Sequence, residues 1–311
     1  MSAAPGRLGA VAGGFGATRL GTFAAAFGAT RLAYGQLRRR PPGNPGSWRR
    51  TNHAGRPVLL QAGPAAAFGS AAAALPSAPA AALAVAAAAA CGRYDDLRGD
   101  HRRGFRAHLT ALRDGEVTSG TVKLLGIGAA SLVAGVLLKE KPVDRVLAGI
   151  VVAGTAHLVN LVDVRPGRAG LLVLGLAAPG LLRGTLAAAP MGAAAALLAD
   201  DLGEVSMLGD MGAHALGAAV GSAVAASNGR LGLAAHAAGL VAAAAWGGAG
   251  VLRLRGASVV RGSGPDAGAL TRVGEPVGVC PARTPSAHRN DATSVPERAY
   301  GPGPGLASLG A

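Results

Sequence analysis

The sequence predicts an all-α protein, a polytopic transmembrane helix bundle of about eight to ten spans. Half of the 311 residues are hydrophobic and only 15% are charged, so a soluble fold would have to bury long Ala, Gly, Leu and Val runs on every side. The 50 glycines and 3% aromatic content suit helices that pack closely in lipid. The apolar–polar alternation that a membrane β-barrel requires does not occur.

The charge distribution points to a membrane rather than to nucleic acid. The formal net charge is +14, carried mainly by Arg clusters between apolar runs. The aromatic side chains on which a single-strand binder stacks bases are missing, so no nucleic-acid partner is expected. Such clusters mark the cytoplasmic side of membrane proteins. Cys91 and Cys280 suggest neither a disulfide framework nor a zinc site, and no cleaved signal peptide is expected.

The first 90 residues predict three helical segments. Residues 11–36 form a weak first span, interrupted by Arg19 and Arg31 within a repeated Phe-Gly-Ala-Thr-Arg-Leu hexapeptide. A low-complexity duplication or a poorly anchored leader is the alternative there. The polar, Arg-rich residues 38–56 are expected in the cytosol. Residues 1–56 thus form a first region that consists of a weak span and a basic cytosolic loop. Residues 58–90 are long enough for two short helices joined near Pro76, and two crossings return both flanking basic loops to one side.

The remaining chain predicts six further spans, at residues 124–138, 146–162, 170–182, 185–198, 213–226 and 231–252. Their alternation places residues 93–123, 163–168, 200–210 and the tail on one face. Residues 139–145, Arg183 and residues 228–230 then lie on the other. The first face holds most of the basic charge, so it is expected to be cytoplasmic, as in a multi-pass bacterial inner-membrane protein. Residues 57–255 make one membrane domain, and residues 256–311 are expected to be a disordered cytosolic tail.

The adjacent carboxylates of Asp95 and Asp96 are the first candidate site. They repel each other unless a cation balances them, and oxygen donors suit Mg²⁺. A solvated loop at a helix end is the alternative.

Residues 102–113, which include Arg106 and other basic side chains, follow this pair. They predict either a helix that lies among lipid headgroups or an ordinary surface helix.

Two further groups follow on the same predicted face. Asn160 and Asp163 are three residues apart at the end of a span, and Arg165 and Arg168 come next at a Pro-Gly turn where they could meet phosphates. A capped helix end with basic flanks is the alternative. Asp210 lies between two glycines near the start of a helix, where it could bind a ligand or cap that helix.

Together these residues resemble the polyprenyl-phosphate phospho-sugar transferase superfamily, glycosyltransferase family 4, which includes phospho-N-acetylmuramoyl-pentapeptide transferase. The resemblance covers about residues 52–252. Three motifs carry it, in the family's order: the Asp95-Asp96 pair, Asn160-Leu161-Val162-Asp163, and Gly209-Asp210-Met211-Gly212 followed by Ala215-Leu216-Gly217.

The resemblance implies Mg²⁺-dependent transfer of a phospho-sugar from a UDP-sugar to polyprenyl phosphate, with release of UMP, for cell-envelope glycan synthesis. It implies that Asp95 and Asp96 handle the lipid phosphate and metal, that Asp163 and Asn160 lie beside the diphosphate, and that Asp210, with Asp163, binds the metal. Arg165, Arg168, Arg106 and Lys123 are candidates for binding the anionic substrates. A homodimer is left open.

The donor side departs from the family pattern. The residues after Asn160 lack the second Asp of the usual motif, Ala213 stands where a Ser is common, and the His-rich loop before the last span has no counterpart. Two alternatives therefore stay open. One is a catalytically silent relative that binds lipid phosphate or scaffolds envelope-synthesis partners. The other is a transporter, which predicts ionisable residues near mid-membrane instead of at span ends.

Overall fold

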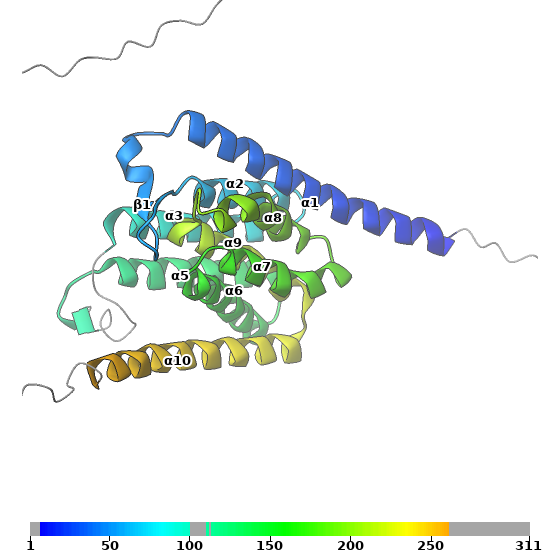
Figure 1. Cartoon of the computed structure of the whole chain (residues 1–311). Helices are drawn as coiled ribbons and strands as arrows, with labels where there is room; N and C mark the ends of the chain where they lie inside the picture. Colours follow the sequence, from blue (N-terminus) through cyan, green and yellow to red (C-terminus); the bar gives the residue numbers. More distant parts are fainter. Residues whose placement is uncertain (1–6, 100–109, 112, 261–311) are drawn as a thin grey trace, which may run out of the picture. The chain divides into compact units, whose positions relative to one another are not determined.

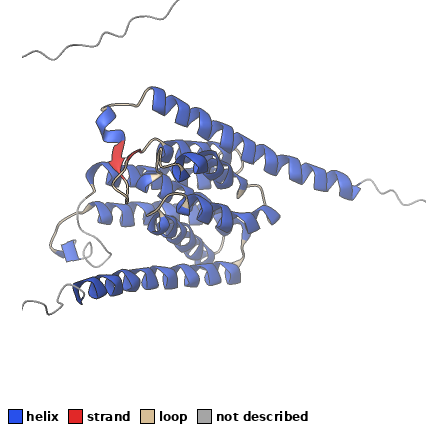
Figure 2. Cartoon of the chain, in the orientation of Figure 1, coloured by secondary structure: helices blue, strands red, loops and turns tan. Residues whose placement is uncertain are grey.

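A computed structural model of the chain describes residues 7–99, 110, 111 and 113–260, with side-chain surroundings from residue 18 to residue 245 outside the same gap. Nine α-helices make up most of this described part (Figures 1 and 2). The expected all-α class is confirmed. The helices are α1 Arg7–Arg39, α2 Ala62–Ala74, α3 Pro79–Arg98, α5 Ser119–Leu138, α6 Pro142–Val162, α7 Arg168–Ala177, α8 Ala188–Leu202, α9 Gly209–Ser227 and α10 Arg230–Val260.

Helix boundaries follow the predicted segments closely. The run at residues 58–90 divides into α2 and α3 around the Leu75–Ala78 connection, because Pro76 cannot continue a helix and Pro79 suits a first helical position. The span expected at residues 170–182 is α7 followed by a short 3₁₀ turn, Ala178–Leu182. Helix α10 continues to Val260, past the residue where the sequence predicts a disordered tail. The rest of that tail, residues 261–311, and Arg106 lie outside the described residues.

Two helices in the described part, α5 and α6, are long and apolar enough to cross a membrane. Helices α2, α7 and α8 have 13, 10 and 15 residues, fewer than the roughly 20 that a bilayer requires. The expected eight to ten crossings therefore remain a prediction.

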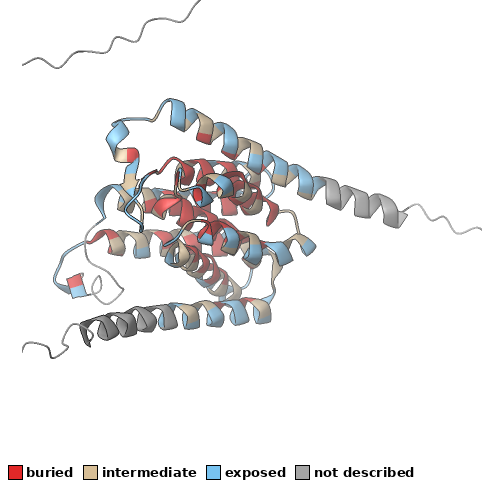
Figure 3. Cartoon of the chain, in the orientation of Figure 1, coloured by how far each residue is buried: buried red, intermediate tan, exposed pale blue. Residues whose placement is uncertain are grey.

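Helix α9 is the central helix, and α2, α3, α6, α7 and α8 pack around it (Figures 1 and 3). Most of its residues are buried. At Gly217 and Gly221 the backbone of α9 lies so close to Ala156 and Val152 of α6 that a side chain would not fit. This close approach explains the abundance of Ala and Gly, since small residues at fourfold spacing let helix backbones touch.

Arg31, which interrupts the first apolar segment, has a partner in the fold. Its guanidinium donates to the Asp200 carboxylate of α8 at 2.5 Å and lies 5.5 Å from the ring centre of Tyr34. The Tyr34 hydroxyl in turn bonds to the Ser206 hydroxyl at 2.9 Å. These contacts join α1 to the end of α8 and make the charge within this segment tolerable.

The chain between α1 and α2 contains a structure that the sequence analysis missed. Residues Arg49–Thr51 (β1) and Pro57–Leu59 (β2) pair in an antiparallel hairpin, where a polar loop was predicted. Asn52 builds its turn, because the side-chain oxygen accepts from the amides of Ala54 and Arg56, both at 2.9 Å. Gly55 has φ 78°, the left-handed conformation that glycine adopts without strain.

The connecting loops gather into two groups, as the predicted alternation requires. On one side Lys139 donates to the Asn228 carbonyl at 2.8 Å, Arg183 to the Asn228 side chain at 2.9 Å, and Arg230 to Asp144 at 2.7 Å. The hairpin and the loops after α6 and α8 come together around one cavity elsewhere. The helix ends that bear Asp96 and Asp210 are joined by hydrogen bonds.

Gly92 supplies a first test of this packing. A Cβ at this residue of α3 would overlap the backbone of Asp210 in α9. We expect Gly92→Ala to lower the free energy of unfolding by about 1–3 kcal/mol, because neither helix backbone can yield. Thermal unfolding in detergent would measure the loss. Gly128→Ala in α5, where a Cβ would meet no neighbouring atom, is the matched control and should be neutral or stabilising. Equal stability of the two variants would contradict the packing.

Candidate functional site

Lys123 brings together two acidic residues that are far apart in the chain. Its ammonium group donates to Asp95 of α3 at 2.6 Å and to Asp210 of α9 at 2.5 Å. The three side chains are only 18–29% exposed. Two carboxylates this close repel each other, so the Lys123 charge between them is what makes the arrangement stable. Three predicted site residues thus meet at one point.

Asp96 makes different contacts from Asp95. Its two carboxylate oxygens accept from the backbone amides of Asp210 at 3.0 Å and Met211 at 3.1 Å, which lie in the first turn of α9, where amides have no partner within the helix. The sequence left open that Asp210 caps its own helix. The structure corrects this, because Asp96 from α3 provides the cap and Asp210 is free to bind Lys123.

Gly209 makes this contact between helices possible. Its φ of 61° lies in the left-handed region, and a Cβ there would press against the Asp96 carboxylate and Leu60. Gly209 therefore lets the first turn of α9 approach the Asp96 side chain closely.

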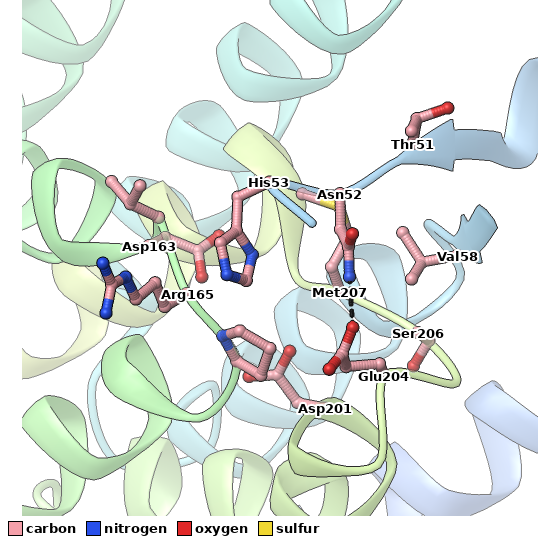
Figure 4. Close-up of a pocket in the computed structure, with 12 residues that line it drawn as sticks. Thr51, Asn52, His53, Val58, Asp163, Arg165, Asp201, Glu204, Ser206 and Met207 are labelled. Atoms are coloured by element: carbon pink, nitrogen blue, oxygen red, sulfur yellow. Dashed lines mark hydrogen bonds between the residues drawn. The ribbon is translucent and has the colours of Figure 1, made fainter. Parts of the chain in front are cut away.

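A cavity of about 110 Å³ lies beside the cap and is shown in Figure 4. Its walls come from the hairpin, the loop after α6 and the loop after α8. Both the His53 ring and the Asp163 carboxyl group point into it (Figure 4). The lining residues are Thr51, Asn52, His53, Val58, Asp163, Val164, Arg165, Pro166, Asp201, Glu204, Ser206 and Met207.

The hairpin is attached to the loop that leads into α9. The Asn52 amide donates to one Glu204 oxygen at 2.5 Å, and Arg56 donates to the other at 2.9 Å. Main-chain bonds join Leu59 to Val205 and Met207. Glu204 itself has φ 54°, a conformation that non-glycine residues seldom adopt and that these bonds help to hold. The pattern Arg-Arg-Thr-Asn, a turn glycine and Pro-Val-Leu was the available signal for this hairpin.

Asp163 ends α6 and lies in the cavity wall with Asp201. Burial is the main cause that raises the pKa of Asp163 to about 8, and the negative charges of Asp201, Asp210 and Asp96 add to the shift. Asp201 holds the loop after α6, because its carboxylate accepts from the Gly167 amide at 2.9 Å. A carboxyl group that is protonated near neutral pH can donate a proton or a hydrogen bond.

The other predicted residues take separate positions. Asn160 is half-buried in the last turn of α6, with its carbonyl accepting from the Asp163 amide at 3.3 Å. Arg165 is exposed at the cavity, and Arg168 is exposed at the start of α7. The structure therefore places Asp163 and Arg165 at the cavity and Asp95, Lys123 and Asp210 at the neighbouring charge cluster.

Asp95 and Asp210 are the carboxylates near Lys123 that could hold a divalent cation. Their oxygens lie 2.6 and 2.5 Å from the Lys123 ammonium nitrogen, and Mg²⁺ in proteins commonly takes one or two carboxylates while phosphates supply further ligands. Within the described residues, no three His, Cys, Asp or Glu side chains form a metal-holding group. The binding of a metal by Asp210 with Asp163 therefore remains a prediction.

Comparison of the chain with models of protein families gives no match, and comparison with curated protein sequences gives none either.

Replacing Lys123 tests the charge cluster. We expect Lys123→Met to lower the free energy of unfolding by about 3 kcal/mol, because two partly buried carboxylates lose their shared cation. Thermal unfolding in detergent is the measurement. Lys139→Met is the matched control, since Lys139 donates to a carbonyl on the other loop group and forms no ion pair within the described residues. Similar melting temperatures for both variants would show that Lys123 does not hold the cluster together.

Asp163 predicts a pH dependence of stability. Its pKa of about 8 exceeds that of an unfolded Asp, so between about pH 4 and 8 unfolding releases a proton and is increasingly favoured as the pH rises. Asp163→Asn removes this loss of stability at high pH. We therefore expect the difference in melting temperature, variant minus wild type, to be larger at pH 8 than at pH 5. Asp114→Asn, at an exposed position, should leave the wild-type profile unchanged. A pH-independent difference between Asp163→Asn and wild type would contradict the shift.

Proposed function

We propose that the protein transfers a phospho-sugar from a UDP-sugar to polyprenyl phosphate at the cytoplasmic face of a bacterial inner membrane. The reaction class is phosphotransfer, with UMP as the second product. The carrying observation is that Asp95, Lys123 and Asp210, from three helices, meet at one point beside a cavity lined by Asp163 and Arg165. Joining two anionic phosphates requires positive charge next to acidic groups that can bind a cation.

The cavity is the proposed position of the diphosphate group of the UDP-sugar. Arg165 offers a cation to the diphosphate, and Arg168 follows at the start of α7. Asn160 lies one turn before Asp163 in α6, and its amide suits hydrogen bonding to the donor. Asp163, with its pKa of about 8, can hold a proton at its carboxyl oxygen while the substrate binds.

Asp95 and Asp210 are the residues that would hold Mg²⁺ together with substrate phosphates. When bound, the ion would neutralise charge on the transferred phosphoryl group. Lys123 then has two roles in this proposal. In the absence of the ion its ammonium group binds both carboxylates, and when the ion is bound it would contact a substrate phosphate. Asp96 positions Asp210 through the α9 amides instead of binding substrate.

The membrane setting is part of the same proposal. Two helices are apolar enough to cross a bilayer, and the proposed cytoplasmic ends carry the Arg-rich hairpin and the basic residues around α3. We propose a multi-pass arrangement in which the shorter helices complete the bundle around α9. The acceptor lipid and the soluble donor would then meet at the boundary between the membrane and the cytosol.

A transfer assay tests the function directly. Membranes containing the protein are incubated with polyprenyl phosphate, Mg²⁺ and a panel of UDP-sugars, and the lipid product and UMP are measured. We expect Asp210→Asn to reduce the rate at least about a thousandfold, because it removes a cation-binding carboxylate. Asp144→Asn, which removes an acid from the opposite loop group, is the control and should remain active. Absence of product and of UMP exchange with every UDP-sugar would reject the transferase.

One specific observation favours a second candidate function. In it the protein is a catalytically inactive relative of these transferases, which binds lipid phosphate or scaffolds envelope-synthesis partners. Both Asp96 oxygens bind backbone amides, and the Lys123 ammonium occupies the place between Asp95 and Asp210. A closed network of this kind is also what a structural core requires. Lipid-phosphate binding that UDP-sugars leave unchanged, without turnover, would favour this candidate, and turnover would remove it.

A further inference from the structure

Arg93 of α3 and Arg50 of β1 lie near the end of α3 and carry positive charge that no ion pair within the described residues neutralises. The Arg50 side chain reaches from the hairpin to main-chain carbonyls, those of Asp96 and of its neighbour Arg49. The guanidinium of Arg93 lies 4.1 Å from the centre of the Trp48 ring. Within the described residues neither arginine has a carboxylate partner within ion-pair distance.

Arg93 has an unsatisfied donor. Its Nη1 atom is buried and has no hydrogen-bond partner among the described residues. The positive charge of Arg50 acts on Arg93 as well, and the nearest acid, Asp96, already uses both carboxylate oxygens on the amides of α9. An unpartnered donor on a charged group costs free energy, which an anionic ligand would recover.

The geometry of Trp48 makes Arg93 suitable for such a ligand. Trp48 is buried, and its indole donates to the Pro42 carbonyl at 2.8 Å, so the ring is fixed. A guanidinium stacked on a fixed ring keeps its planar edge in one orientation, and that edge matches the oxygens of a phosphate. The hairpin brings Arg50 to the same helix end, where its guanidinium donates to the Asp96 carbonyl.

An exposed apolar stripe on α3 leads to this pair of arginines. Leu83, Tyr94 and Leu97 are 48%, 39% and 52% exposed, with exposed Ala90 between them on the same helix face. From Leu83 to Leu97 the stripe extends about 21 Å along the helix. Arg93 is four residues before Leu97, so it borders the stripe at its charged end. A cationic end on a long apolar surface suits a ligand with a phosphate and a hydrocarbon tail.

We propose that Arg50 and Arg93 bind the phosphate of a lipid phosphate whose hydrocarbon tail lies along the exposed face of α3. The choice of polyprenyl phosphate as this lipid rests on the proposed function. The same helix end carries Asp95 and Asp96, so a headgroup held here is next to the charge cluster. The arginines therefore receive the acceptor lipid, and the acids around Lys123 act on it.

Binding without turnover tests this site. The purified full-length protein is titrated with polyprenyl phosphate in detergent, without UDP-sugar, and bound lipid is counted by native mass spectrometry. We expect R50Q/R93Q to weaken binding about ten- to a hundredfold, because two charge-assisted contacts are lost. R49Q/R98Q is the matched control, since it removes the same charge from exposed positions on the same two elements. Equal weakening in both pairs, or none in R50Q/R93Q, would overturn the site.

A second measurement uses the wild-type protein, so it does not depend on folding of the variants. A polyprenyl phosphate with a photoreactive group next to the phosphate should label the α3 peptide that contains Arg93. Labelling confined to other peptides would overturn the site. Inorganic phosphate at equal concentration should leave the lipid bound. If inorganic phosphate displaces the lipid, the site binds free phosphate and the role of the hydrocarbon tail is overturned.

The two proposals fail separately in these experiments. Lipid binding that depends on Arg50 and Arg93, without transfer, rejects the transferase and keeps the lipid site. Transfer with unchanged lipid affinity in R50Q/R93Q rejects the lipid site and keeps the transferase.

Discussion

The ammonium group of Lys123 is the contact on which the arrangement of the site depends. It holds Asp95 of α3 and Asp210 of α9 within hydrogen-bond distance of one atom, although like charges would otherwise push these helix ends apart. Asp96 strengthens the same junction by capping α9. At Gly92 the backbone of α3 lies directly against the Asp210 backbone at this junction. The charge cluster and the helix packing therefore support each other.

The fold could be predicted well because its signals are local. Pro76 and Pro79 mark the connection between α2 and α3, and apolar runs of the right length mark α5 and α6. The hairpin was missed because its three-residue strands carry Arg and Thr at exposed positions, which resemble a solvated loop. The turn signal between the strands was present, but the contacts that attach the hairpin come from a distant residue, Glu204, which the local sequence does not reveal.

The proximity of Asp95, Asp96 and Asp210 could be predicted, but not the contacts that each of them makes. The Asp95-Asp96 pair and Asp210 do lie together, as their positions on one predicted face required. Adjacent residues of a helix point in directions about 100° apart, so Asp95 meets Lys123 while Asp96 meets α9. Nothing in the sequence distinguishes these two directions, because they depend on where the neighbouring helices lie. The place of Asp163 in a separate cavity wall depends on the hairpin in the same way.

The hairpin connects the two halves of the proposed reaction site. Through Asn52, Arg56 and Leu59 it is attached to the loop that precedes Asp210, and so it covers the donor cavity. Through Arg50 it reaches the end of α3, where the acceptor phosphate is proposed to bind. One small element thus contacts both proposed substrate positions, and its strands are short enough that their mutual hydrogen bonds alone would not keep them folded. Its order therefore depends on the bonds to Glu204 and to the Asp96 carbonyl, which link the cavity wall to the end of α3.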